Sequence, residues 1–316
     1  MKQHTMPKPL NYYLYLKPFA TLLRLLARLL APRLTPTPTT TLHIPSRDPN
    51  RTIKVHVYTP PTTQRKQQQK GPTPLLLNFC GSGFIIQGHG LDDPYCHHIA
   101  QNTSYTVFDI QYRMSPEHPF PAPLEDAEDV ISWVRSRPEV YDLDRLGLSG
   151  FSAGGNVAVS LAANHEGPFK ALVAFYPVVD AVRSVEERVA VEREGVKLPG
   201  WFMRFCTKAY LSRGVELVGG RGDVRVSPIF RDVVDGWKVE RVLCVSPARD
   251  VLAGEVEELA GKLAEGGKTE GGRFLKKVVC ERVEGCGHGW DKVAKEGTEA
   301  WEKRMRVYGM VVDLLK

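Results

Sequence analysis

The segment Gly150-Phe151-Ser152-Ala153-Gly154 follows an apolar run, Leu146–Ser149, and precedes a helical pattern that begins near Asn156. A G-x-S-x-G sequence between a strand and a helix is typical of a sharp turn that exposes a nucleophilic serine. Glycines two residues to either side remove side chains that would collide with the strained backbone of the serine. A glycine-rich turn with a chance serine would not account for the flanking strand and helix. Ser152 is therefore the candidate nucleophile.

The rest of the chain alternates between strand-like and helical patterns. Apolar runs rich in β-formers occur at Thr52–Tyr58, Leu75–Phe79, Tyr105–Ile110, Leu146–Ser149, Ala171–Phe175, Val242–Val245 and Val278–Val283. Helical patterns occur at Tyr95–Gln101, Leu124–Arg135, Asn156–His165, Glu255–Leu263 and Trp301–Leu315. This alternation predicts an α/β fold with a mostly parallel sheet that carries helices on both faces. Reactive groups are then expected just beyond the carboxyl ends of the strands.

The predicted organisation is one catalytic domain with an N-terminal extension. Residues 1–50 are interpreted as a helix and a linker, and residues 51–316 as the catalytic domain. Between about 177 and 238 the chain passes without a clear strand, and a loop this long inside a compact domain is usually functional. We expect this insertion and the N-terminal helix to form a helical cap over the site. The polar, proline-rich stretch 60–74 is expected to be an exposed hairpin connection.

Positive charge is concentrated near the N-terminus. The net charge is +6, seven Lys or Arg precede Asp48, and no acidic residue does. The remainder is nearly balanced, which argues against a nucleic-acid partner. The leucine-rich segment Tyr12–Leu34 contains Arg24 and Arg28, which disfavour both a transmembrane helix and a signal peptide. We expect this helix to pack over the site. A peripheral contact with a membrane surface and a mitochondrial transit peptide remain alternatives.

Composition also bears on compartment and cofactors. The six cysteines show no C-x-x-C spacing and are interpreted as free thiols in a reducing compartment, which predicts a cytoplasmic protein, with membrane association left open. Cys96-His97-His98 are adjacent rather than at metal-ligand spacing, and there is no H-E-x-x-H. No dinucleotide-binding glycine pattern follows a strand. We therefore expect no metal and no cofactor. A homodimer is left open.

Two further residues complete a candidate catalytic set. His288 lies in a glycine-rich loop, residues 284–290, directly after a predicted strand, and Asp250 lies shortly after another. The order Ser152, Asp250, His288 is the order of nucleophile, acid and base in strand–turn–helix hydrolases of this kind. The acid would hold the tautomer of the imidazole. Asp291 is a rival acid, but it follows His288. The remaining alternatives are a solvent-exposed loop histidine and an acid paired only with the adjacent arginine.

The oxyanion of an acyl-transfer intermediate needs backbone N–H donors. Ala153, the residue after the nucleophile, would supply one. Other donors are expected from the loop Cys80-Gly81-Ser82-Gly83-Phe84, which follows the predicted strand Leu75–Phe79.

Several segments together resemble the hormone-sensitive-lipase-like carboxylesterases, the α/β-hydrolase-3 family. They are Tyr112-Arg113-Met114-Ser115-Pro116-Glu117-His118-Pro119-Phe120-Pro121-Ala122, Gly150-Phe151-Ser152-Ala153-Gly154-Gly155-Asn156, Ser227-Pro228 and Asp250-Val251-Leu252. The resemblance covers most of the chain after Leu75. It implies the α/β-hydrolase fold, a helical cap, no cofactor, and hydrolysis of esters with short or medium acyl chains. Carried over from the family, the oxyanion donors are Ser82, Gly83 and Ala153.

Three residues depart from the family pattern. Cys80 stands where the family has the histidine of an HGGG motif, Ser82 replaces a glycine, and Phe151 replaces an aspartate. We expect the Ser82 side chain to face the space beside the oxyanion, either as a steric gate or as an extra donor.

The favoured function is therefore hydrolysis of a small-molecule carboxylic ester through an acyl-enzyme intermediate. The alternative is a lyase, acyl-transfer or condensation step at the same site, in the biosynthesis of small molecules. A third hypothesis is a binding protein that has kept the fold without catalysis. The presence of all three candidate catalytic residues argues against that hypothesis.

Overall fold

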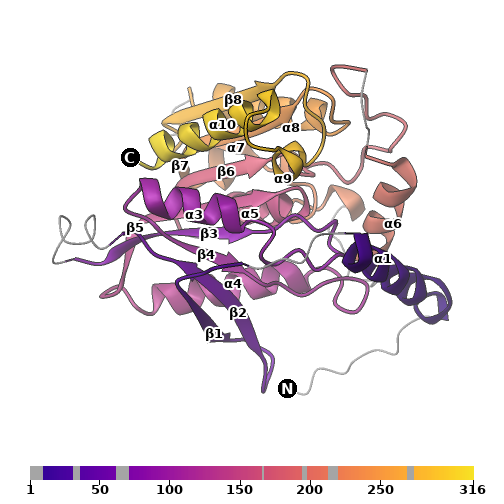
Figure 1. Ribbon diagram of the computed structural model, residues 1–316, viewed down its shortest axis with the longest axis horizontal. Helices are drawn as coiled ribbons and strands as arrows, with labels where there is room; N and C mark the ends of the chain where they lie inside the picture. Colours follow the sequence, from indigo (N-terminus) through magenta and orange to yellow (C-terminus); the bar gives the residue numbers. More distant parts are fainter. Residues whose placement is uncertain are drawn as a thin grey trace.

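The computed structural model describes residues 10–30, 36–61, 71–165, 167–193, 198–212, 220–268 and 274–316. Within them, a central sheet runs in the order β1-β2-β4-β3-β5-β6-β7-β8 (Figure 1). The strands are β1 (Thr40–Pro45), β2 (Thr52–Tyr58), β3 (Thr73–Phe79), β4 (Thr106–Ile110), β5 (Tyr141–Phe151), β6 (Phe169–Phe175), β7 (Val239–Pro247) and β8 (Lys277–Val283). From β4 to β8 all neighbours are parallel, while β2 is antiparallel to both β1 and β4. The predicted mostly parallel α/β sheet is confirmed.

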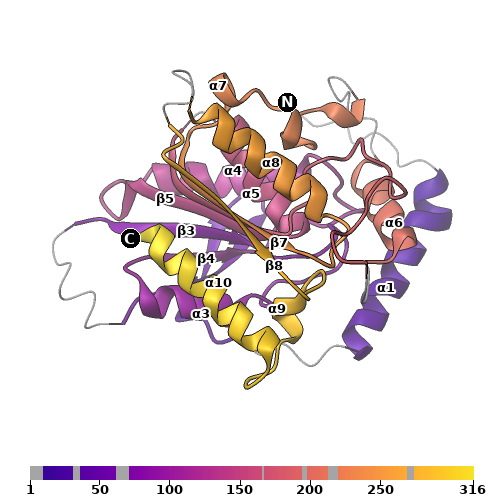
Figure 2. The ribbon, with the colours of Figure 1, turned by 90° about the horizontal axis from the view of Figure 1, so that it is seen from above.

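Helices cover both faces of this sheet (Figure 2). On one face lie α4 (Ala122–Arg135), α5 (Ala153–Asn164) and α8 (Ala253–Gly266), and on the other lie α3 (Asp93–Asn102) and α10 (Glu299–Leu315). β4 is buried along its whole length, as a central strand covered on both faces must be. All seven predicted strands and all five predicted helices of the catalytic domain are present, with boundaries shifted by a few residues.

Shorter elements complete the described chain. They are η1 (Tyr12–Leu16), α1 (Lys17–Leu30), α6 (Gly200–Tyr210), η2 (Gly220–Gly222), η3 (Pro228–Phe230), α7 (Val233–Gly236) and α9 (Trp290–Val293). In the described parts of the chain, no helix combines the length and the apolar composition needed to cross a membrane.

Two features at the start of the sheet differ from the sequence prediction. β1 lies in the stretch interpreted as linker, and it pairs with β2 from Thr40 to Pro45, so the sheet begins before residue 51. The expected hairpin between β2 and β3 is wrong, because β4 lies between these two strands. The chain therefore crosses over one strand position instead of turning back on its neighbour.

The N-terminal helix packs on α6, which belongs to the segment expected to form the cap (Figure 2). Leu16 and Ala20 are fully buried in a small apolar cluster with Ile85 and Phe205. Arg24 fastens the helix to the body: its guanidinium donates to the carbonyl oxygens of Ile85 and Ser115 at 2.9 and 2.8 Å and pairs with Glu117 at 2.8 Å. The arginine that interrupts the leucine run therefore points inward, and α1 forms a layer outside α6.

Deletion of residues 1–34 should therefore damage the cap more than the sheet. It would expose Ile85 and Phe205 to water and leave Glu117 without Arg24, so we expect reduced solubility and reduced turnover of esters. The far-UV circular dichroism of the catalytic domain should change little beyond the loss of one helix. A truncated protein that is soluble and as active as the full chain would show that α1 is not part of the cap.

Candidate active site

The turn at Ser152 joins the end of β5 to the start of α5. Its backbone has φ 51° and ψ −116°, a conformation that is strained for a residue with a side chain. A Cβ at Gly154 would lie 2.1 Å from the carbonyl oxygen of Phe79, and one at Gly150 would lie 2.3 Å from the carbonyl oxygen of Gly154. Both glycines are therefore required by close backbone approach. The Ser152 N–H donates to Phe175 at 2.9 Å and ties the turn to β6.

The structure brings together the three residues of the candidate catalytic set. Ser152 Oγ lies 2.9 Å from His288 Nε2, and His288 Nδ1 lies 2.7 Å from Asp250 Oδ2. Asp250 is fully buried, and its second carboxylate oxygen accepts the Leu252 N–H at 3.1 Å. This arrangement requires the imidazole tautomer that carries its proton on Nδ1, leaving Nε2 free to accept the serine proton.

The charge of Asp250 governs the basicity of the imidazole. Burial by itself lowers the pKa of His288, but the charge and hydrogen bond of Asp250, with a smaller contribution from Asp291, outweigh it, so the pKa is raised above its ordinary value of 6.5. The histidine is thereby a stronger base than an exposed imidazole, and its protonated form is stabilised by a fixed negative charge.

Asp291, the rival acid, lies in a different position. Its carboxylate accepts a hydrogen bond from the Tyr176 hydroxyl and pairs with Lys292 Nζ at 2.9 Å. The Tyr176 ring in turn packs edge-on against the His288 ring, with 4.7 Å between centroids. Asp291 is therefore linked to His288 by contacts through Tyr176, whereas Asp250 forms a direct hydrogen bond with the imidazole.

A buried ion cluster beneath the nucleophile was not anticipated. Lys292 Nζ lies 2.6 Å from Asp92 and 3.3 Å from the centroid of the Phe151 ring. Burial lowers the pKa of Lys292, but Asp291 and Asp92 outweigh this and raise it, so the amine stays charged. A cation over an aromatic face is attracted by the negative π-cloud. Phe151, which replaces the aspartate of the family, thus has Lys292 as its partner. No sequence signal links these residues, because they come from distant segments.

The expected oxyanion donors lie in the same cavity as the nucleophile. Ser82, Gly83 and Ala153 all line it together with Ser152 and His288. Among the described residues, no hydrogen bond uses the N–H group of Gly83 or Ala153, so both remain available to a ligand. Gly83 has φ 56°, and a Cβ there would lie 2.8 Å from Cys206 Sγ, so the loop packs tightly under α6.

The Ser82 side chain differs from our expectation. Its Oγ accepts the Phe84 N–H at 2.9 Å and lies 2.7 Å from the Tyr112 hydroxyl, which donates to the Cys80 carbonyl at 2.6 Å. Since the single proton of Tyr112 goes to Cys80, the proton of Ser82 goes to Tyr112. The hydroxyl proton is thus used inside the loop, so the side chain is not a free donor to an oxyanion. Its role is to hold the loop in place.

The cavity itself is small and apolar. Its volume is about 250 Å³, below the range of roughly 300–1,000 Å³ that is usual for drug-sized ligands. Apolar and aromatic side chains dominate its walls. The walls include Phe84, Leu91, Val178, Phe202, Met203, Tyr210 and Leu211.

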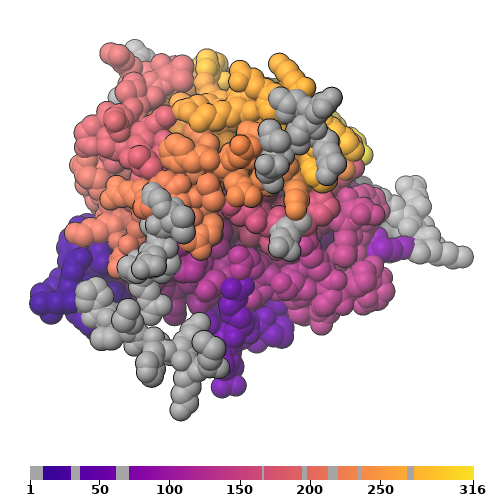
Figure 3. All heavy atoms as spheres, turned by 180° about the vertical axis from the view of Figure 1, so that it is seen from behind, coloured from indigo at the N-terminus to yellow at the C-terminus, as the bar shows by residue number. Residues whose placement is uncertain are grey.

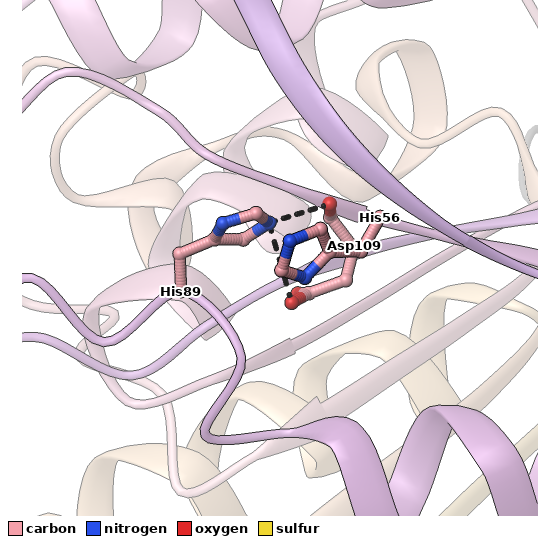
Figure 4. Close-up of side chains that lie close together, drawn as sticks. All are labelled: His56, His89 and Asp109. Carbon is pink, nitrogen blue, oxygen red and sulfur yellow. Dashed lines mark hydrogen bonds and ion pairs between the residues drawn. The ribbon is translucent and has the colours of Figure 1, made fainter. Parts of the chain in front are cut away.

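Three chemically capable side chains that do not line this cavity, His56, His89 and Asp109, lie close together (Figure 4). In the described residues, His56, His89 and Asp109 place three potential metal ligands within 4.8 Å of one another. The two imidazole rings stack, with centroids 3.9 Å apart, so their in-plane lone pairs do not converge on one point. Asp109 is engaged by Asn78 and the Gly90 N–H, and burial lowers the pKa of His89 to about 4. The cluster braces the loop after β3.

Comparison with known proteins agrees with the geometry of the site. A family model described as "alpha/beta hydrolase fold" matches residues 76–292. An esterase of Mycobacterium tuberculosis is 35% identical over 112 residues, 35% of this chain and 34% of its own length. An ethyl acetate hydrolase of Pseudomonas putida is 30% identical over 200 residues, 61% of this chain and 59% of its own length. The chain thus spans from about a third to three fifths of these relatives.

A solved structure extends the likeness to the whole fold. A thermostable carboxylesterase from a metagenomic library superimposes with a TM-score of 0.73 at 25% identity, covering 95% of this chain and 97% of the other. These relatives are named as esterases and hydrolases, so they lend no support to the lyase, acyl-transfer or condensation alternative.

Ser82→Ala should lower kcat for every ester by about tenfold, because the loop that carries the oxyanion donors loses its internal bracing. Tyr112→Phe should have a similar effect, and the double variant should lose little more than either single one. The measurement is kcat over a series of p-nitrophenyl esters of increasing acyl length. Ser160→Ala, which removes another buried hydroxyl, is the control. Unchanged kcat for the acetate with altered selectivity for longer chains would show that Ser82 is a gate instead.

Proposed function

The chain belongs to the α/β-hydrolase family, and on that basis we propose that it hydrolyses small carboxylic esters through an acyl-enzyme intermediate on Ser152. The resemblance to the hormone-sensitive-lipase-like carboxylesterases is confirmed by the family match and by the relatives described above. One observation carries the proposal: the hydrogen-bonded chain from Ser152 through His288 to Asp250, placed at the wall of an apolar cavity.

The first half of the reaction forms the acyl-enzyme. Ser152 Oγ attacks the ester carbonyl carbon while His288 Nε2 takes the hydroxyl proton, and Asp250 stabilises the imidazolium. The carbonyl oxygen becomes an oxyanion that accepts the backbone N–H groups of Ser82, Gly83 and Ala153. Collapse of the tetrahedral intermediate breaks the bond to the leaving oxygen, which receives its proton from His288. The alcohol departs.

The second half repeats the chemistry with water. His288 Nε2 takes a proton from a water molecule, and the oxygen of that water attacks the acyl carbon. The same donors stabilise the second oxyanion, and the proton on His288 returns to Ser152 Oγ as the acid leaves. Each proton removed is returned, so the site needs no further reactant.

The small cavity supports an ester with a short acyl chain and a compact alcohol. Three relatives carry names that refer to acetates or acetylated compounds: the Pseudomonas ethyl acetate hydrolase, a versiconal hemiacetal acetate esterase of Dothistroma septosporum and a 3-O-acetylpapaveroxine carboxylesterase of Papaver somniferum. An acetyl or similarly short acyl ester of a small molecule is therefore the substrate class that we propose.

Ser152→Ala and His288→Ala should each lower kcat by at least ~10³-fold toward p-nitrophenyl acetate, because each removes a member of one functional unit. For the same reason the double variant should be little worse than either. Ser132→Ala, an exposed serine of α4, is the matched control, and thermal unfolding should be similar in all four proteins. If the reduction of kcat in the double variant equals the product of the two single reductions, Ser152 and His288 act independently.

The pH dependence of kcat/KM should follow the neutral form of His288. Because the pKa of His288 is raised above 6.5 by Asp250, activity should be high at alkaline pH and fall by about tenfold per pH unit below that pKa. Asp250→Asn should move this acid limb to lower pH, besides lowering the rate. An acid limb that stays in place in the Asp250→Asn variant would contradict the assignment of Asp250 as the partner of His288.

A further inference from the structure

The outer side of the N-terminal helix carries a row of exposed leucines. Leu16 and Ala20 face inward and are fully buried, yet six leucines of the same segment lie on the surface, with Leu10 72% and Leu29 71% exposed. We name these six the leucine stripe: Leu10, Leu14, Leu22, Leu25, Leu26 and Leu29. Isolated exposed leucines are ordinary, but a contiguous set of this kind marks a surface for interaction.

The spacing of the leucine stripe shows that it forms one face. Leu10 and Leu14 are one turn apart, and Leu22, Leu25 and Leu29 follow at intervals of three and four, which places them along one side of a helix. The inner side of the same helix already packs on α6. Figure 2 shows α1 at the edge of the molecule, with α6 on its inner side, and Figure 3 shows the indigo N-terminal segment at the periphery. The helix is therefore apolar on two sides, of which α6 covers one.

Basic side chains surround this apolar row. Lys17 and Arg28 of α1 are exposed, and so is Lys208 of α6, which lies 4.9 Å from the centroid of the Tyr15 ring. No acidic residue precedes Asp48 in the sequence. Of the described acidic side chains near α1 and α6, Glu117 pairs with Arg24 and Glu186 pairs with Arg204. Among the described residues on α1 and α6, the exposed charges beside the leucine stripe that form no ion pair are therefore positive.

The charge decides which partner fits this surface. A second copy of the chain would bring Lys17, Arg28 and Lys208 against their own equivalents, and like charges across an interface are unfavourable. An anionic lipid surface matches both features of the helix. Its hydrocarbon can take up the leucines, and its negative headgroups can pair with the cations. A helix that lies in the plane of the membrane also needs no membrane-spanning length.

We propose that the leucine stripe docks the protein on an anionic lipid surface, with η1 and α1 lying along the headgroup layer. The docked helix rests on α6, whose inner residues Phe202 and Met203 line the catalytic cavity. Docking would therefore place α1 and α6, rather than the helices that cover the two faces of the sheet, against the membrane. An ester dissolved in the lipid would meet the cap first.

Co-sedimentation with vesicles tests this docking on the full chain. Wild-type protein should bind phosphatidylcholine vesicles containing phosphatidylserine at least about tenfold more tightly than pure phosphatidylcholine vesicles. The variant Leu22→Gln, Leu25→Gln, Leu29→Gln should lose binding to both by a similar factor. The variant Lys17→Gln, Arg28→Gln, Lys208→Gln should lose only the preference for phosphatidylserine.

Two matched variants control for composition. Val140→Gln, Val293→Gln removes two exposed apolar side chains outside the cap, and Lys268→Gln, Lys295→Gln, Lys316→Gln removes three exposed charges outside it. Both should bind vesicles as the wild type does. Equal hydrolysis of dissolved p-nitrophenyl acetate by all variants would show that they are folded.

Two results would overturn the docking proposal. One is a wild-type protein that ignores vesicles containing phosphatidylserine. The other is a wild-type dimer in sedimentation velocity that the leucine variant converts to a monomer, because the leucine stripe would then be covered by a second copy. Neither result bears on ester hydrolysis by Ser152, which is measured in the absence of lipid.

Discussion

The close approach of two backbone segments at the nucleophile turn determines how the rest of the site is built. Gly154 passes so near the carbonyl oxygen of Phe79 that no Cβ fits, and this contact allows α5 to start directly at the end of β5. Ser152 is held between them in a strained conformation that costs about 1–3 kcal/mol, so the surrounding strands must fix it. In return for this cost, the turn fixes the position of the serine hydroxyl. The serine side chain stands clear of the sheet, where residues that follow β7 and β8 reach it.

Packing beneath this turn depends on charges as well as on apolar contacts. Lys292 is enclosed between Asp92, Asp291 and the face of Phe151. Removing one partner of such a buried cluster typically costs about 3–5 kcal/mol, because the remaining charge loses its compensation. Tyr176 connects the cluster to the imidazole, since its hydroxyl bonds Asp291 and its ring packs on His288. The replacement of the family aspartate by Phe151 is therefore accompanied by a cation that suits an aromatic ring.

The proximity of Ser152, Asp250 and His288 was predictable because each follows a strand of a parallel sheet, and carboxyl ends of parallel strands meet at one edge. The strands themselves were predictable from continuous apolar runs. Other features depend on contacts between distant segments and left no local pattern. The hydroxyl of Ser82 meets Tyr112, thirty residues later, so a substitution that suggested a gate or an extra donor also braces a loop. β1 is an edge strand with mostly exposed side chains, which explains why a threonine-rich stretch resembled a linker. The hairpin prediction failed because sequence order does not reveal that β4 inserts between β2 and β3.

The central claim is that Ser152 carries the acyl group during turnover. Its most direct test is mass spectrometry of the wild-type protein, acid-quenched during steady-state hydrolysis of p-nitrophenyl acetate. We expect a fraction of the protein to gain one acetyl group, located on the peptide that contains Ser152, and to lose it once the ester is exhausted. Steady turnover with the acetyl group on a residue other than Ser152 would contradict the account. So would the absence of any acetylated protein at every time point under conditions in which deacylation limits the rate.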